Sequence, residues 1–86
     1  MNVKFTIRKL NGMIFDMANA TVDERIDLKN RFCSELAKLL EEFEASDSVA
    51  CKSIAEVYLT EVRNGNYIKA LDCLEYLEGV NKDLLF

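Results

Sequence analysis

The sequence predicts an α+β fold that is mainly α-helical: an N-terminal β-hairpin packed on an antiparallel arrangement of three helices. Two observations carry this prediction. The first ten residues alternate between apolar and polar side chains and lead into Asn11-Gly12, whereas later segments space their apolar residues as helices do. With 86 residues, the chain has room for a single domain, residues 1–86. The expected elements are a hairpin at 1–18, helices at 21–45, 48–63 and 66–78, and an apolar tail at 79–86.

The hairpin is predicted from the period of the side chains and from the turn. From residue 3 to residue 8 every second residue is apolar, which is typical of a half-buried strand. Asn11 and Gly12 both accept positive φ, as a tight hairpin turn requires. Residues 13–17 can then return as a second strand that pairs Ile7 with Met17.

The same residues also fit a helix, which gives an all-α alternative with residues 3–18 helical. Val3, Ile7, Leu10, Ile14 and Met17 follow helical three- and four-residue spacing. We favour the hairpin because a helix would carry Asn-Gly at its centre, which costs about 1 kcal/mol or more in helix propensity.

The boundaries of the three later helices are marked by capping and turn residues. Thr21 followed by Glu24 forms the pattern of a capping box, so a helix should begin at about residue 22. Residues 46–48 should end this helix and cap the next one. Gly65 suits the left-handed position that follows a helix, and the third helix should start just after it.

The charge of the chain argues against nucleic acid as its partner. The net charge is −4 and the only basic cluster is Lys4, Arg8 and Lys9, whereas nucleic-acid binders concentrate Lys and Arg on one surface. The same three residues interrupt any signal-peptide core, and no apolar run reaches the roughly 18 residues of a membrane span. We therefore expect a cytoplasmic protein, from a bacterium or a phage, that does not enter a membrane.

The residues that usually carry enzyme chemistry are few. The chain has no His, so neither a nucleophile nor a metal site of the usual kind has its common partner. Cys33, Cys51 and Cys73 are odd in number and lie in apolar helical patterns, which indicates buried free thiols. The acidic residues at 41–44 are expected on a solvated helix face. We predict that the protein is not an enzyme and uses no cofactor or metal.

Two segments resemble parts of known folds. Residues 55–78, AEVYLTEVRNGNYIKALDCLEYLE, resemble one tetratricopeptide hairpin, and residues 65–71 resemble its inter-helix turn and second helix. The strand, Asn-Gly turn, strand and helix expected at the N-terminus resemble the first half of a β-grasp domain. The first resemblance implies a helical hairpin only, because tetratricopeptide arrays need about three units to bury a continuous core.

The abundance of large apolar residues predicts an interaction surface. Half of the chain is apolar, and a core of this size cannot hold every large side chain. Contiguous exposed apolar area usually marks an interface, so we expect a homo-oligomer, a protein partner, or both. The surplus comprises Phe5, Phe15, Phe32, Phe43, Ile68, Tyr76, Leu84, Leu85 and Phe86.

The function expected from these observations is a small acidic interaction protein that binds and restrains a protein partner, as inhibitors, immunity proteins and phage regulators do. One alternative is an oligomeric sponge for a small anionic ligand or nucleotide, held by Arg63, Tyr67 and Lys69. Another is a structural subunit of a larger assembly. The predicted interface residues are Tyr58, Arg63, Tyr67, Ile68, Lys69, Tyr76, Leu84, Leu85 and Phe86.

Overall fold

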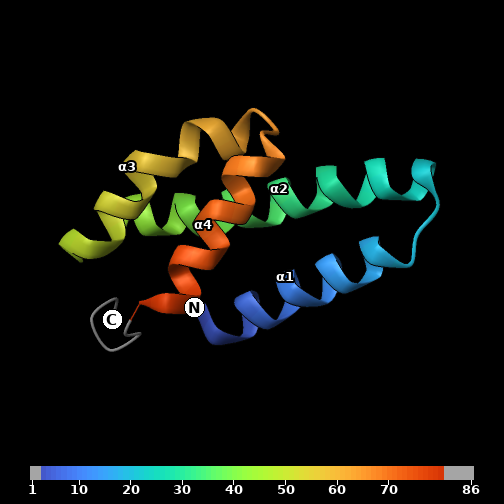
Figure 1. Ribbon diagram of the computed structural model, residues 1–86. Coiled ribbons are helices and arrows are strands. Elements are labelled where there is room, and N and C mark those ends of the chain that lie inside the picture. Colours follow the sequence, from blue (N-terminus) through green and yellow to red (C-terminus); the bar gives the residue numbers. More distant parts are fainter. Residues whose placement is uncertain (1–2, 81–86) are drawn as a thin grey trace.

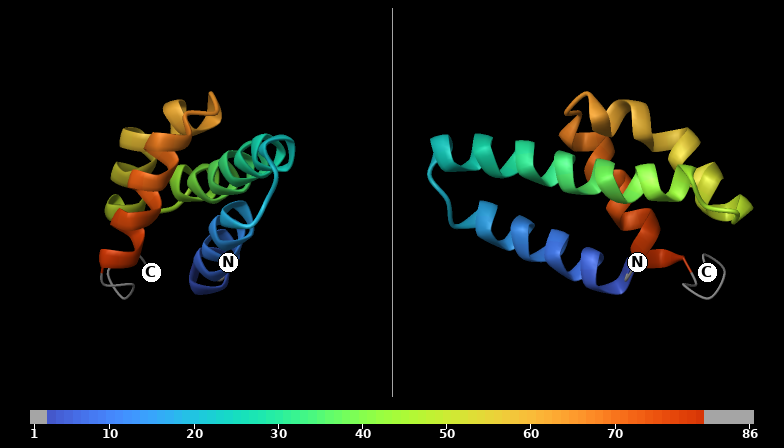
Figure 2. Two further views of the ribbon diagram at one scale, coloured as in Figure 1. Left: turned by 45° about the vertical axis from the view of Figure 1, so that its right-hand side comes forward. Right: turned by 180° about the vertical axis from the view of Figure 1, so that it is seen from behind.

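The computed structural model describes residues 3–80, and within this range every regular element is an α-helix. The first two helices form a long antiparallel hairpin, and the last two pack across one half of it (Figure 1; Figure 2). The other half, next to the turn at residues 19–21, extends beyond them, so that the molecule measures 40 × 22 × 18 Å. The helices are α1 (Val3–Ala18), α2 (Val22–Glu44), α3 (Val49–Arg63) and α4 (Tyr67–Gly79).

The predicted N-terminal β-hairpin is wrong, because residues 3–18 form the single helix α1. The helix places Val3, Ile7, Leu10 and Met17 on one face, where all four are buried. Burying an apolar side chain is worth about 1.5–3 kcal/mol, so four of them outweigh the cost of Gly12 inside a helix. The all-α alternative therefore agrees with the structure of residues 3–80. The resemblance to a β-grasp domain depended on the hairpin and is wrong as well.

The predicted capping box at the start of α2 is confirmed. The backbone N–H of Glu24 donates to Oγ1 of Thr21, and the backbone N–H of Thr21 donates to Oε1 of Glu24, each at 3.3 Å. The Thr21 side chain also donates to this carboxylate at 2.8 Å, and these bonds lower the pKa of Glu24. Two otherwise unpaired donors of the first turn are thus satisfied, and α2 begins one residue after the threonine.

The shorter helices are delimited in the same way. The Ser48 side chain accepts from the N–H of Cys51 at 3.3 Å, and the Asn66 side chain accepts from the N–H of Lys69 at 3.2 Å. Between α3 and α4, Gly65 has a φ of 83°, the left-handed conformation predicted for it. The helical hairpin implied by the tetratricopeptide resemblance is present as α3 and α4.

The core lies along α2, which contacts all three other helices. Among the described residues, every buried side chain is apolar or a cysteine thiol. Ile26, on the first half of α2, is 57% exposed because α3 and α4 pack on the other half of the hairpin. The buried residues of α2 are Phe32, Cys33, Leu36, Ala37, Leu39, Leu40 and Phe43. None of the helices found in residues 3–80 is long and apolar enough to cross a membrane.

Candidate functional site

An apolar groove runs between α3 and α4, and we call it the α3–α4 groove. It encloses about 320 Å³, and most of the surface that it exposes is apolar. One wall consists of five α3 residues at helical spacing, and the other is formed by α4 and the residue that follows it. The lining residues are Ala50, Ser53, Ile54, Val57, Tyr58, Tyr76 and Val80.

Two tyrosines face each other across this groove. The ring centroids of Tyr58 and Tyr76 are 6.3 Å apart, with the ring planes inclined at 46°. Tyr58 is half-buried, and burial raises the pKa of its hydroxyl, helped by the nearby Cys73, Asp72 and Tyr76. Tyr76 is 50% exposed, so a molecule in the groove would meet its ring directly. Such rings offer large apolar area with a polar edge, which favours them at protein interfaces.

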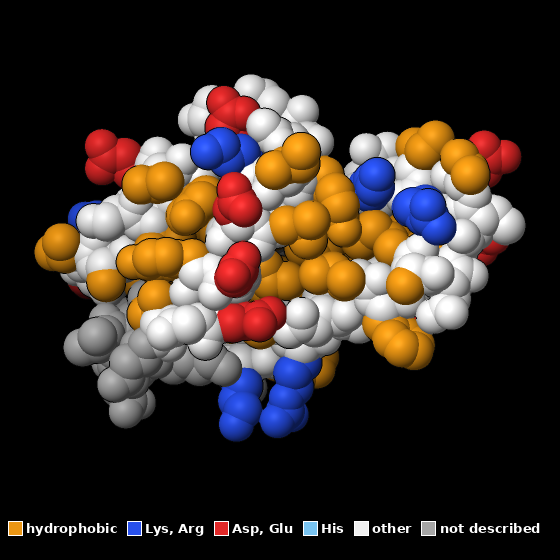
Figure 3. Space-filling model, viewed as in Figure 1, with side chains coloured by type: hydrophobic (Ala, Val, Ile, Leu, Met, Phe, Trp, Pro, Cys, Tyr) orange, Lys and Arg blue, Asp and Glu red, His pale blue; other side chains and the backbone are white. Residues whose placement is uncertain are grey.

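Negative charge borders the groove. The acidic residues of α4, Asp72, Glu75 and Glu78, are all exposed. Figure 3 shows acidic side chains in a row along α4, with hydrophobic side chains gathered on both sides of the row. The carboxylate of Asp72 also helps to raise the pKa of the Tyr58 hydroxyl. The arrangement combines an apolar floor with an acidic border.

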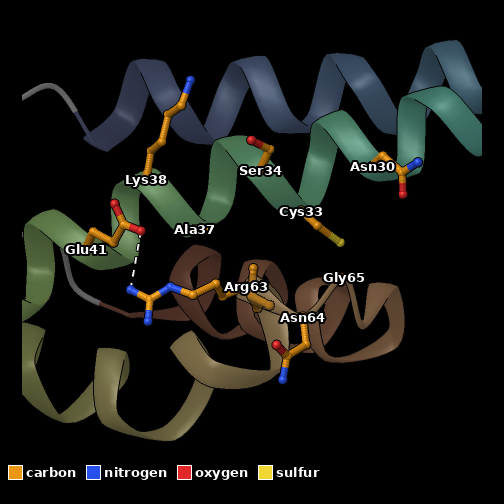
Figure 4. A pocket seen from close by; sticks show the side chains of 10 residues that line it. Asn30, Cys33, Ser34, Ala37, Lys38, Glu41, Arg63, Asn64 and Gly65 are labelled. Carbon is orange, nitrogen blue, oxygen red and sulfur yellow. Dashed lines mark hydrogen bonds and ion pairs between the residues drawn. The ribbon is translucent and has the colours of Figure 1, made fainter.

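A second pocket, between α2 and α3, is larger but more polar and more open than the α3–α4 groove (Figure 4). It encloses about 460 Å³, and in it Nη2 of Arg63 lies 3.3 Å from Oε1 of Glu41. Lys38 lines the same pocket. Because a carboxylate already neutralises the guanidinium of Arg63, this pocket is a poor anion site. We therefore regard the smaller α3–α4 groove as the better candidate.

The three residues predicted for an anionic ligand have different surroundings. Arg63 is paired with Glu41, whereas the ring of Tyr67 packs edge-on against Phe32, with centroids 5.5 Å apart. Nζ of Lys29 lies 5.1 Å from the centre of the Tyr67 ring, a cation–π distance. The exposed Lys69 contributes its backbone N–H to the cap of α4. These contacts are those of helix packing and capping.

Sequence reasoning found part of the groove and missed part of it. Of the predicted interface residues, the structure brings Tyr58 and Tyr76 together in the groove, while Ile68 is 71% exposed elsewhere on α4. Leu84, Leu85 and Phe86 lie outside the described residues. The lining residues missed on α3 are Ala50, Ser53 and Val57, which are small or apolar side chains beside the buried stripe of that helix. Ile54 belongs to the buried stripe itself, and Val80 follows α4.

The three cysteines are buried thiols that form no disulfide, and burial makes Cys33 and Cys73 poorer acids. Burial raises the pKa of Cys73 to about 12 and also raises that of Cys33. Within residues 3–80, no three His, Cys, Asp or Glu side chains are grouped so as to hold a metal ion. The thiols therefore contribute to packing.

A second apolar surface lies at the free end of the α1–α2 hairpin, and we call it the hairpin tip: Phe15, Val22 and Ile26. These residues flank the turn at 19–21, and their exposed fractions are 71%, 71% and 57%. Val22 and Ile26 are four residues apart, so they lie on one face of α2. Among residues 3–80, no other helix covers this face, because α3 and α4 pack on the other half of the hairpin.

Comparison of the chain with protein-family models, with curated proteins and with solved structures gave no match.

Proposed function

We propose that this protein is a non-catalytic binding module whose α3–α4 groove holds an apolar helix of a protein partner. The observation that carries the proposal is the groove itself: apolar walls and a pair of tyrosines, beside exposed carboxylates. By binding this helix in its groove, the protein would restrain its partner, as inhibitors, immunity proteins and phage regulators do. We place it in the cytoplasm.

The dimensions and the chemistry of the groove favour a helix as the occupant. Helix-in-groove recognition inserts apolar side chains at positions i, i+3, i+4 and i+7 into a hydrophobic channel. The volume of about 320 Å³ is at the small end of ligand pockets, which suits a few apolar side chains. Val57 is 67% exposed at its rim and would be covered by such a helix.

The charges bordering the groove indicate a basic partner. Asp72, Glu75 and Glu78 are exposed on α4, and the chain as a whole carries a net charge of −4. Complementary charge accelerates the encounter and selects between partners more than it adds affinity. The helix recognised should therefore combine an apolar stripe with flanking Lys or Arg residues.

A photo-crosslinking residue at position 57 tests this proposal in cells of the natural host. The matched control is position 49, because Val49 is also an exposed valine of α3, at 79%, but does not line the groove. We expect a single crosslinked protein from position 57, competed by untagged wild-type protein, and none from position 49. Equal crosslinking from both positions, or none from position 57, would contradict the proposal.

A further inference from the structure

The α3–α4 groove is adjacent in sequence to a segment with three large apolar residues. Val80, which lines the groove, is directly followed by residues 81–86, and this segment lies outside the described residues. The segment has the sequence NKDLLF, so three polar residues come first and Leu84, Leu85 and Phe86 follow them. An apolar groove and an apolar segment are therefore neighbours along the chain.

The segment is long enough to reach every part of the groove. The lining of α3 extends from Ala50 to Tyr58, and eight residue steps at about 1.5 Å each make about 12 Å. Six residues span up to about 20 Å when the chain is extended. Because Val80 is itself part of the lining, the apolar residues that follow it can reach either tyrosine of the groove. The hairpin tip, in contrast, lies on the other half of the α1–α2 hairpin.

The groove offers apolar surface to such a segment. Val57 at its rim is 67% exposed, and the Tyr76 ring is 50% exposed. Removing apolar area from water is worth about 25 cal/mol per Å². A segment joined to its binding site by a few residues is present there at an effective concentration on the order of millimolar. A weak apolar contact is therefore enough to fill the groove.

We propose that residues 84–86 occupy the α3–α4 groove of their own chain until a partner helix displaces them. The inference rests on the proposed function, because it describes how the same groove is regulated. A partner helix can bind only those molecules whose groove is open, so its apparent Kd rises as the open fraction falls. A segment that fills the groove nine-tenths of the time weakens partner binding about tenfold.

Photo-crosslinking in the purified protein tests the inference. A photo-crosslinking residue at position 57 should form crosslinks to residues 84–86 of the same chain. Trypsin separates residues 53–63, which carry the crosslinker, from residues 83–86, so mass spectrometry of the digest identifies the product. The matched control is position 22, because Val22 is also an exposed valine, at 71%, but belongs to the hairpin tip. In a mixture of isotopically labelled and unlabelled protein, crosslinks within one chain join only peptides of the same label.

Two variants of the segment test whether the contact is apolar. Leu85→Asp should reduce the yield of the crosslink from position 57 at least tenfold, because an unpaired carboxylate is unfavourable in an apolar groove. Asn81→Asp adds the same charge at a polar position of the segment and should leave the yield within about twofold of the wild type. Circular dichroism verifies that both variants retain the helices.

Four results would overturn the inference. Position 57 may give no crosslink to residues 84–86, or position 22 may give an equal yield. The crosslinked peptides may mix the two labels at random, which would identify a second copy as the occupant. Leu85→Asp may leave the yield unchanged.

These outcomes are distinguishable from a failure of the proposed function. A partner crosslinked from position 57 in host cells, without an intramolecular crosslink in the purified protein, would leave the groove as a binding site and exclude the segment as its occupant. An intramolecular crosslink, with no partner captured in cells by the wild type or by Leu85→Asp, would support the segment as occupant and contradict the proposed function.

Discussion

Gly12 lies inside α1 without any need for its special backbone freedom. It is exposed, its φ is not positive, and a Cβ added there would have no neighbour within 4 Å. Gly65 has equally open surroundings, but its φ of 83° is one that L side chains rarely adopt. Substitution by alanine should therefore change the free energy of unfolding in opposite directions at Gly12 and Gly65.

We expect Gly12→Ala to raise the free energy of unfolding by about 0.5–1 kcal/mol, because glycine inside a helix is less favourable than alanine by that amount. Gly65→Ala should lower it by about 1–2 kcal/mol, because alanine is strained in the left-handed region. Urea denaturation followed by circular dichroism measures both. A destabilised Gly12→Ala variant would speak for a tight turn at this position and against α1.

Cys73 is fully buried, and its pKa of about 12 keeps the thiol protonated at neutral pH. We expect iodoacetamide at pH 8 to leave Cys33, Cys51 and Cys73 unmodified in the folded protein and to modify all three in denaturant, as read by intact mass. Rapid labelling of Cys73 in the native protein would show that the core around it opens readily.

At the scale of the elements, α1 depends on its buried face. Leu10 is completely buried, and Phe15 on the same helix is 71% exposed. We expect Leu10→Ala to destabilise the protein by about 2–5 kcal/mol through lost burial and a cavity. Phe15→Ala should change the free energy of unfolding by less than about 0.5 kcal/mol, as surface substitutions usually do. If the two variants unfold at the same urea concentration, α1 does not pack as described.

An ion pair links α1 to α2. Nζ of Lys9 lies 3.2 Å from Oε2 of Glu35, and Lys38 approaches the other oxygen at 3.6 Å. The hydrogen bond from Lys9 is the main cause that lowers the pKa of Glu35 below its ordinary value of 4.5. A carboxylate with a lowered pKa stabilises the fold above its unfolded pKa, and that contribution is lost as the pH falls through the folded pKa.

We therefore expect Glu35→Gln to cost about 0.2–1 kcal/mol of stability at pH 7, the range of exposed pairs, and to cost less as the pH falls below about 4. Urea denaturation across this pH range measures the difference from wild type. Glu44→Gln, at an exposed carboxylate, serves as the control and should show a smaller effect. A difference that stays constant down to pH 3 would rule out the ion pair as its source.

The elements also show what the sequence could predict. The starts of α2, α3 and α4 follow from Thr21, Ser48 and Asn66, because a cap is a local interaction between residues three apart. The conformation of residues 3–18 does not follow in this way. There a strand period and a helix period coincide, and the choice depends on contacts with α2 and α4 that lie far away in the sequence.

At the scale of the whole molecule, the net charge of −4 and the acidic border of the α3–α4 groove predict how partner binding responds to salt. Exposed charges are screened beyond about 10 Å at 0.1 M salt. We expect binding of a basic partner helix in the groove to weaken as NaCl rises from about 0.02 to 0.5 M, measured by sedimentation velocity. Binding that strengthens with salt would mean that apolar contact alone drives it.

The candidate site depends on how the helices pack in the whole molecule, which limits how much of the site can be predicted from the sequence. Tyr58 and Tyr76 could be singled out as aromatic residues near a helix corner, but their pairing across a groove depends on how α3 and α4 pack. Val57 was missed because it lies outside the main apolar stripe of its helix. An isolated valine on a polar face carries little signal until the neighbouring helix is in place.

The two tyrosine rings in the groove provide an intrinsic fluorescence signal for occupancy of the groove. The chain contains no tryptophan and three tyrosines, so its ultraviolet emission comes from tyrosine, and two of the three emitters line the α3–α4 groove. Any helix that settles there changes the solvation of both rings, while Tyr67 is held against Phe32 outside the groove. A tryptophan-containing peptide would in addition accept energy from these two rings, so occupancy can be titrated without attaching a dye.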